Sequence, residues 1–153
     1  MTNESIDAAT LFEQTQLFKI SDFKNENFKI DGTNTDSVLI LSPSFSSVLP
    51  AEERAMLSKM LNALKLNIEN VALCAAAKPP PFHFLKSKIA FTKLLVFGIE
   101  PQSIGMNINA EVNRVINFRN TKIVFSETLS TLIGNEKSKG MLWKALKEMF
   151  EIN

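Results

Sequence analysis

Hydroxyl side chains follow an apolar run near residue 40 of this chain, in the stretch LSPSFSSV. Ser42, Ser44, Ser46 or Ser47 would be the candidate nucleophile if a general base activated it. The only imidazole in the chain is that of His83, beside a triple proline. The GxSxG pattern of a nucleophile elbow does not frame these serines. Loop and helix-capping roles therefore explain them better than nucleophilic catalysis.

Residue counts limit the other kinds of chemistry. One Cys and one His are too few for a zinc or iron–sulfur site without carboxylate-only ligands. Neither a Walker loop nor a GxGxxG dinucleotide loop occurs in the sequence. We therefore expect no metal ion and no cofactor. The stretch KLLVFGIEPQSIG still reads as a buried strand that ends at Gly98, a position where open α/β sheets commonly bind ligands.

Length and composition predict one compact domain. The 153 residues are 45% hydrophobic, which is enough to build a core. The single cysteine, Cys74, lies in the apolar run NVALCAAA, so an internal disulfide cannot form and a reduced, cytoplasmic compartment is expected. The sequence shows neither a secretory signal nor a run of the ~18 apolar residues that span a bilayer, so we expect no membrane association.

Periodicity predicts alternating strands and helices. Four short apolar runs have the pattern of strands buried on both faces of a parallel sheet: SVLILS, NVALCA, KLLVFG and TKIVFS. Two longer stretches, 49–66 and 137–150, have helical periodicity. Their expected inner faces are Leu57, Met60, Leu61 and Leu64 in the first, and Leu142, Ala145, Leu146 and Met149 in the second. The alternation predicts an α/β fold, a three-layer α/β/α sandwich around a mostly parallel four-stranded sheet.

Charge is distributed unevenly although the net charge is only +1. Between residues 71 and 99, lysines alternate with aromatic residues and no acidic residue occurs. This pattern is typical of a weak single-stranded DNA site, in which lysines follow phosphates and rings stack on bases. The candidates are Lys78, Phe82, His83, Phe84, Lys86 and Lys88. Solvated helix lysines above core phenylalanines would give the same pattern.

The order of the segments resembles the uracil-DNA glycosylase superfamily over roughly residues 37–150. VLILSPSFSSV lies where those enzymes have a strand and their first catalytic loop, and NVALCAAAKPPPF is similar to their second strand with its proline-rich continuation. KLLVFGIEPQSIG corresponds to a strand and glycine turn. The stretch 121–150 resembles the closing strand, the intercalating loop and the last helix, which here carries Lys139 and Trp143. The resemblance extends to the degenerate relative that serves as the psi subunit of the DNA polymerase III clamp loader.

Departures from the family pattern indicate a non-catalytic member. Active members place a carboxylate or Asn in the first loop and a His after the last strand, and this chain has Ser42, Pro43 and Ser44 in the first loop and FSETLSTL at the second position. Glu127 would oppose a developing anion there unless it were protonated. The loops of the expected degenerate site contain Ser42, Pro43, Ser44, Phe45, Gly98, Ser126, Glu127 and Thr128.

A five-residue match lies in the polar N-terminal segment, residues 1–36, which we expect to be helical or extended and to pack on the glycosylase-like domain at 37–153. QTQLF fits the loose Q-x-x-L-F pattern of bacterial sliding-clamp peptides, in which Leu17 and Phe18 would fill an apolar pocket and Gln14 would bind at its edge. The same side chains could instead dock on their own sheet.

These observations lead to two expectations for function. The first is a non-catalytic accessory or scaffold protein in DNA replication or repair, similar to the psi subunit, with clamp or clamp-loader proteins as partners. The second is a divergent DNA glycosylase that acts on a damaged base. A structural protein with no nucleic-acid role is a third reading of the same sequence, because fold resemblance is only an analogy for function.

Overall fold

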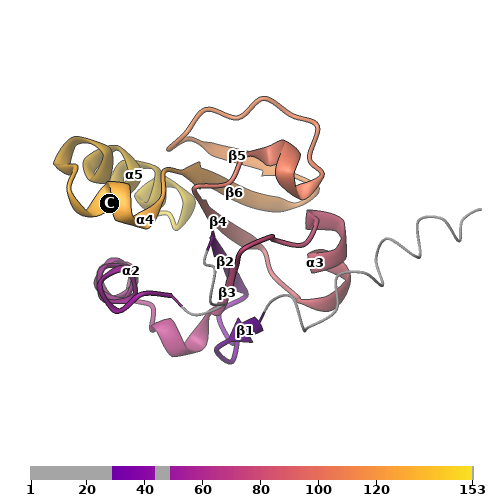
Figure 1. Ribbon diagram of the computed structural model, residues 1–153, viewed down its shortest axis with the longest axis horizontal. Coiled ribbons are helices and arrows are strands. Elements are labelled where there is room, and N and C mark those ends of the chain that lie inside the picture. The colour runs from indigo at the N-terminus through magenta and orange to yellow at the C-terminus, as the bar shows by residue number, and fades with distance from the viewer. Residues whose placement is uncertain (1–28, 44–48, 153) are drawn as a thin grey trace, which may run out of the picture.

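A mixed six-stranded sheet forms the centre of the protein, in the strand order β1-β3-β2-β4-β6-β5 (Figure 1). The computed structural model describes residues 29–43 and 49–152. The strands are β1 Lys29–Asp31, β2 Val38–Pro43, β3 Ala72–Ala76, β4 Lys93–Phe97, β5 Val115–Phe118 and β6 Thr121–Ser126. The sheet is therefore wider and more mixed than the four-stranded one expected from the sequence.

The four inner strands are those that the apolar runs predicted. β3, β2, β4 and β6 pair in parallel, with Ile40 aligned to Leu73 on one side and to Leu95 on the other. β1 and β5 are antiparallel additions at the two edges. β5 joins β6 through a tight turn at Arg119 and Asn120, whose φ angles of 50° and 63° are those of the turns that fit hairpin twist.

Apolar side chains leave both faces of the inner strands and build a core on each side. Ile40, Leu95 and Val124 point to one face, and Leu39, Leu94 and Ile123 point to the other. All six side chains are buried. This two-sided burial explains why the strands read as continuous apolar runs rather than as alternating ones.

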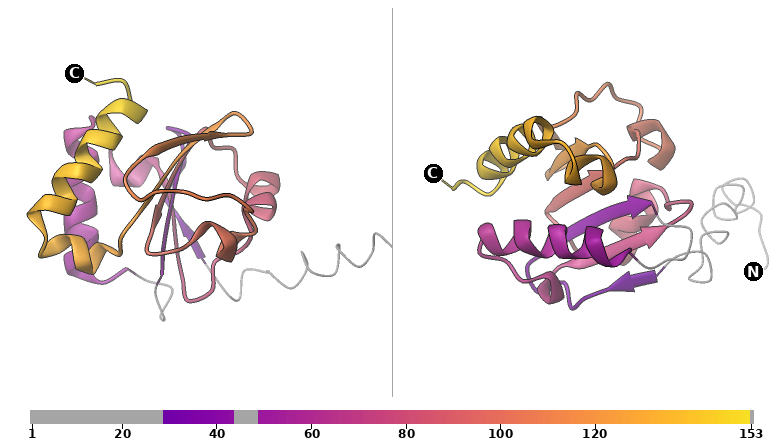
Figure 2. Two further views of the ribbon diagram at one scale, coloured as in Figure 1. Left: turned by 90° about the horizontal axis from the view of Figure 1, so that it is seen from above. Right: turned by 60° about the vertical axis from the view of Figure 1, so that its left-hand side comes forward.

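Helices lie on both faces of the sheet (Figure 2). On one face are α2 Ala51–Ala63, α4 Leu129–Ile133 and α5 Glu136–Met149, with the 3-10 turn η2 Ile68–Asn70 after α2. On the other are α3 Phe82–Lys88 and the 3-10 helix η3 Pro101–Ile104. The mixed α/β class is thus confirmed.

Local sequence fixes where these helices begin. Side-chain oxygens of Thr128 and Asn135 accept hydrogen bonds from the backbone N–H of Thr131 and Ser138, which caps α4 and α5. The α2 helix follows Pro50 and carries two glutamates in its first turn, where the helix dipole favours negative charge.

The predicted inner faces of the two long helices are largely confirmed. Leu142, Ala145, Leu146 and Met149 of α5 are all buried, and so are Leu57 and Leu61 of α2 and Leu64 just after it. Met60 is the exception, since its side chain is only partly buried.

The N-terminal segment contributes one strand to this sheet. Residues 29–31 of the expected 1–36 segment form β1, which pairs with β3, and residues 1–28 lie outside the described part of the chain. Among the described residues, no helix combines the length and the apolar character needed to cross a membrane.

Candidate functional site

The expected degenerate site lies where the parallel strands end. Because β2, β4 and β6 run in the same direction, Ser42, Gly98 and Thr128 come to one edge of the sheet. A cleft of about 200 Å³ opens there. Its lining consists of Ser42, Pro43, Glu53, Ala77, Thr128, Leu129 and Ser130. Ser44 and Phe45, which the sequence placed in the same site, lie outside the described residues.

Gly98 has a packing role at this edge. Its φ angle is +67°, and a Cβ atom built on it would lie 2.4 Å from Cγ2 of Thr128. Its backbone N–H also donates to the carbonyl oxygen of Ser126 at 2.8 Å. The glycine therefore allows the end of β4 to pack closely against the start of α4, which is sufficient reason for its presence.

Two of the hydroxyl groups predicted for this site, those of Ser126 and Thr128, already have structural partners. The buried Ser126 donates to Oδ1 of Asn113 at 2.7 Å. Thr128 caps α4 and donates to the hydroxyl of Thr131 at 2.8 Å. Glu127 is partly buried, and its Oε1 atom is shielded from solvent without a hydrogen-bond partner among the described residues.

The cleft contains few groups that could do acid–base chemistry. Among the side chains that line it, Glu53 is the one that carries an acidic or basic group. His83 is exposed on α3, whose neighbours Phe82 and Leu85 pack on the opposite face of the sheet from α2 and α4. Within the described part of the chain, this arrangement does not pair a nucleophile with an imidazole base.

The aromatic half of the expected DNA site is not available to bases. Phe82 and Phe84 are buried, at 5% and 7% exposure, and the Phe82 ring packs edge-on against Phe91 and Phe118. Base stacking requires an exposed ring face, so the prediction that these two rings stack on bases is wrong.

The basic side chains of the same stretch differ in exposure. Lys86 donates to the carbonyl oxygen of Phe91 at 2.7 Å, and its Nζ atom lies 4.4 Å from the centre of the Phe91 ring. Lys78, Lys88 and His83 are exposed. The reading of solvated lysines above core phenylalanines therefore fits this region better. The clamp-peptide residues Gln14, Leu17 and Phe18 lie outside the described residues and stay a prediction.

Cys74 is not a candidate nucleophile. Its side chain is 1% exposed in β3, and burial raises the pKa of the thiol to about 12, because the thiolate would lose its hydration. Within the described ranges, no three His, Cys, Asp or Glu residues form a group that could hold a metal ion.

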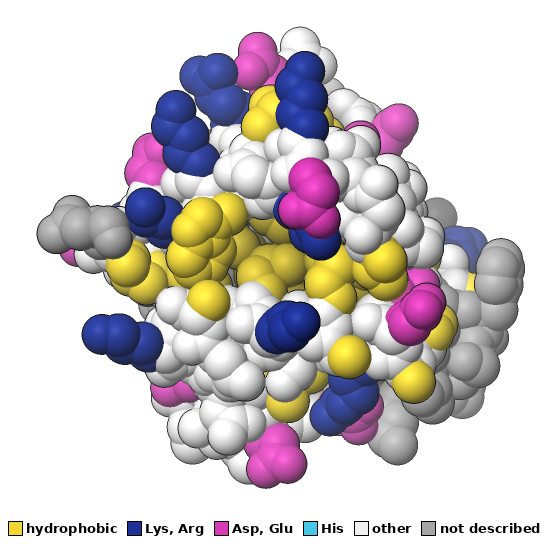
Figure 3. Space-filling model, turned by 90° about the vertical axis from the view of Figure 1, so that its left-hand side faces the viewer, with side chains coloured by type: hydrophobic (Ala, Val, Ile, Leu, Met, Phe, Trp, Pro, Cys, Tyr) yellow, Lys and Arg dark blue, Asp and Glu magenta, His cyan; other side chains and the backbone are white. Residues whose placement is uncertain are grey.

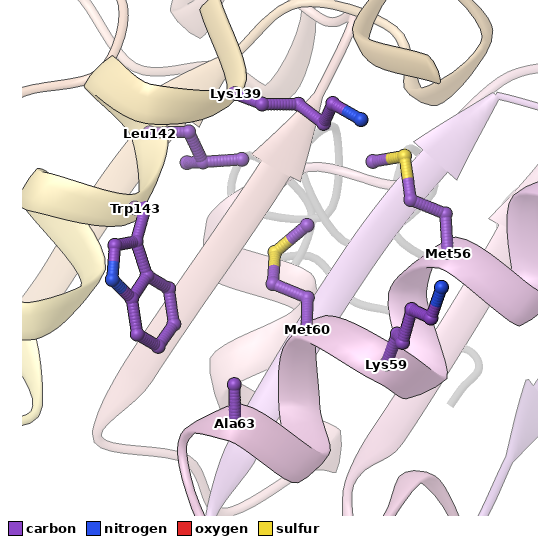
Figure 4. Close-up of a pocket in the computed structure, with 7 residues that line it drawn as sticks. All are labelled: Met56, Lys59, Met60, Ala63, Lys139, Leu142 and Trp143. Atoms are coloured by element: carbon purple, nitrogen blue, oxygen red, sulfur yellow. The ribbon is translucent and has the colours of Figure 1, made fainter. Parts of the chain in front are cut away.

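A larger apolar hollow lies elsewhere, on the outer side of the α2/α4/α5 layer (Figure 3). A groove of about 360 Å³ separates α2 from α5. Its walls are formed by Met56, Lys59, Met60, Ala63, Lys139, Leu142 and Trp143, and we call this set the α2/α5 groove (Figure 4). A second hollow of about 250 Å³ adjoins it and adds Glu52, Ala55 and Ile133 to the lining.

Sequence reasoning missed this groove, although a signal for it was present. The apolar residues of α2 cover more than the stripe that faces the sheet, since Met56, Met60 and Ala63 lie beside Leu57 and Leu61. A helix with so wide an apolar arc must contact something besides its sheet. The position of Trp143 on α5, next to the core residue Leu142, repeats the signal.

Comparison with known proteins gives no assignment, because neither a protein-family model nor a curated protein matches this chain.

Proposed function

We propose that this chain is a non-catalytic domain with a uracil-DNA glycosylase-like three-layer fold that works through protein contacts. Its role would be that of an accessory or scaffold protein in DNA replication or repair, similar to the psi subunit of a clamp loader. The observation that carries the protein-binding part is the α2/α5 groove, an apolar hollow on the outside of the molecule.

The groove has the composition of a protein-binding surface. Two methionines, a leucine and the only tryptophan of the chain contribute to its walls. Tryptophan is enriched among the residues that dominate binding energy, and methionine adapts its shape to different partners. An apolar hollow rimmed by charged side chains commonly marks a site for another macromolecule.

The cleft at the strand ends supports the non-catalytic part of the proposal. Ser126 and Thr128 already have structural hydrogen bonds, and the lining side chains do not include an imidazole. The replication context rests on the order of segments at 37–150 and on the QTQLF match at Gln14, Leu17 and Phe18. Single-stranded DNA is not part of the proposal, because the rings of Phe82 and Phe84 are buried.

Affinity capture of the tagged full-length chain from its own cells tests this function. The capture is run at low salt and at ~0.3 M salt, because contacts mediated by nucleic acid weaken steeply as salt rises. We expect clamp or clamp-loader subunits to remain bound through the salt step. Recovery of no replication or repair protein would refute the proposal.

The cleft favours one alternative, a divergent DNA glycosylase, because it lies at the strand ends where α/β enzymes bind ligands and because Glu53 lines it. Base release from oligonucleotides that carry uracil, alkylated or oxidised bases would test it. Release that is lost in Glu53→Gln and retained in the neighbouring Glu52→Gln would establish the enzyme and displace the accessory role.

A further inference from the structure

The α2/α5 groove has a shape that can accommodate a further helix between α2 and α5. Residues that line it or the adjoining hollow recur along α2 at Glu52, Ala55, Met56, Lys59, Met60 and Ala63, with the spacing of one helical stripe. From Glu52 to Ala63 this stripe is about 17 Å long, which is about three helical turns. An α-helix of that length would lie along α2 and fill the hollow.

The side chains that form the groove point toward its centre from both walls. Met56 and Met60 extend from α2 toward α5, and Leu142 extends from α5 toward α2 (Figure 4). Behind them the buried Leu57, Leu61 and Leu146 hold the two helices on the sheet. The floor is therefore rigid and the methionine surface is adaptable, a combination that suits helix-in-groove recognition.

The charge of the groove selects the polar face of its occupant. Lys59 on α2 and Lys139 on α5 line the main hollow, whose lining contains no carboxylate, and Glu52 lines only the adjoining hollow at the end of the stripe. Lys139 pairs with Glu136 at 2.9 Å, but the Glu136 side chain is 89% exposed, so this ion pair contributes little and is easily exchanged. No described carboxylate lies within ion-pair distance of Lys59. Lys59 on the α2 wall and Lys139 on the α5 wall can thus each form an ion pair with an acidic side chain of a molecule that lies in the groove.

From this geometry we infer that the α2/α5 groove binds an acidic amphipathic helix of a partner protein. Its apolar residues, spaced i, i+3 or i+4, and i+7, contact Met56, Met60, Leu142 and Trp143. Its Asp or Glu residues lie against Lys59 and Lys139. The inference rests on the proposed protein-binding function and adds to it the class of partner and the residues that select it.

The test uses a display library of helical peptides about 16 residues long with fixed apolar positions and polar positions free to be acidic, neutral or basic. The full-length chain is the bait. We expect the selected peptides to be enriched in Asp and Glu at positions that flank the apolar stripe. Selection of no binder, or of binders enriched in Lys and Arg, would overturn the inference.

Matched variants locate the binding. Met60→Glu places a charge in the groove, and Met141→Glu makes the same change on α5 at a side chain that is 49% exposed and does not line it. We expect a loss of at least tenfold in peptide affinity for Met60→Glu and less than twofold for Met141→Glu. The opposite order would place the site outside the groove. Circular dichroism confirms that both variants fold.

Charge reversal tests whether Lys59 and Lys139 cause the preference for acidic peptides. In the double variant Lys59→Glu/Lys139→Glu, acidic peptides should bind at least tenfold more weakly and basic peptides more tightly. The control double variant Lys137→Glu/Lys144→Glu changes the same charge at exposed α5 positions that do not line the groove. An equal loss in both double variants would mean that net charge, rather than the groove, attracts the peptides.

Two other occupants would contradict the inference in distinguishable ways. If the chain's own N-terminal segment filled the groove, the full-length variant Leu17→Glu/Phe18→Glu would bind the acidic peptides at least tenfold more tightly. If a second copy filled it, the protein would be dimeric in sedimentation analysis and Met60→Glu would make it monomeric. If Met60→Glu still captured replication proteins from cells as the original chain does, the proposed function would remain supported. Only the assignment of the groove as the binding surface would be excluded.

Discussion

At the residue scale, several side chains that resembled site residues prove to be packing residues. Gly98 fits a left-handed turn against Thr128, and Ser126 satisfies a buried amide oxygen of Asn113. Each of these roles is a contact between segments distant in sequence. Sequence alone located Gly98 and Ser126 correctly at strand ends, but it could not distinguish a group that holds a ligand from one that holds the fold.

Gly98→Ala should destabilise the protein strongly. A left-handed backbone costs a residue with a side chain about 1–2 kcal/mol, and the new Cβ would also clash with Cγ2 of Thr128 at 2.4 Å. Gly140→Ala is the control, because a Cβ at that α5 position would meet no neighbouring atom within 4 Å, and alanine should stabilise the helix by about 1 kcal/mol. Urea unfolding measures both changes. A neutral Gly98→Ala would mean that the turn is not held as described.

Ser126→Ala should cost about 1–3 kcal/mol of unfolding free energy, because Oδ1 of Asn113 would lose its buried donor. Ser130→Ala, at an exposed position near the same cleft, should change stability little. A double variant with Asn113→Ala checks the pairing. If the effects of Ser126→Ala and Asn113→Ala simply add, the two side chains do not interact.

Burial of Cys74 should appear as a pH dependence of stability. The thiol keeps its proton in the folded protein up to about pH 12, whereas an exposed thiol loses it near its ordinary pKa of about 8.5. Above that ordinary value the unfolded chain binds fewer protons, so stability contributed by the neutral thiol falls as the pH rises toward 12. Urea unfolding at pH 8 and pH 10.5 should show a smaller loss for Cys74→Ala than for the original chain. Equal losses would contradict burial of the thiol.

At the element scale, the sequence predicted the parts that repeat a simple pattern. The four inner strands are continuous apolar runs and the two long helices have clear periodicity, so both were predictable. β1 was missed because it is only three residues long, and β5 because its side chains are mostly half-exposed at a sheet edge. Asn120 in the tight turn before β6 was the available signal for the β5–β6 hairpin.

The wide apolar arc of α2 was a signal that this helix contacts more than its sheet, but the groove itself could not be predicted because it depends on the spacing between two helices. Periodicity placed Met60 on the inner face of α2 together with Leu61, and only the position of α5 decides which of them reaches the sheet. The sequence also could not decide whether Phe82 and Phe84 are buried. An interleaved Lys and Phe pattern describes a core helix and a DNA surface equally well.

The two apolar faces of α2 should respond differently to truncation. Leu61→Ala should cost about 2–5 kcal/mol, because this side chain is fully buried against the sheet. Met60→Ala should cost less than half of that, because the groove already leaves its side chain partly open to solvent. Chemical denaturation of the two variants makes the comparison. Equal costs would indicate that α2 and α5 close over Met60 in solution.

At the scale of the whole molecule, the described residues include two surfaces suited to binding. The cleft at the strand ends is lined by Glu53 together with hydroxyl-bearing and apolar side chains, and the α2/α5 groove is larger and more uniformly apolar. The proposed accessory function uses the groove, and the alternative glycosylase would use the cleft. Variants in one surface should leave the other intact, because Glu53 lines the cleft and Met60 lines the groove.

The decisive measurement for the accessory function is quantitative capture from cells at ~0.3 M salt, with the full-length chain, Met60→Glu and Met141→Glu compared side by side. We predict that the original chain and Met141→Glu recover the same clamp or clamp-loader subunits, and that Met60→Glu loses them. Absence of replication and repair proteins from all three captures would contradict the accessory function, and base release by the purified chain would then favour the glycosylase.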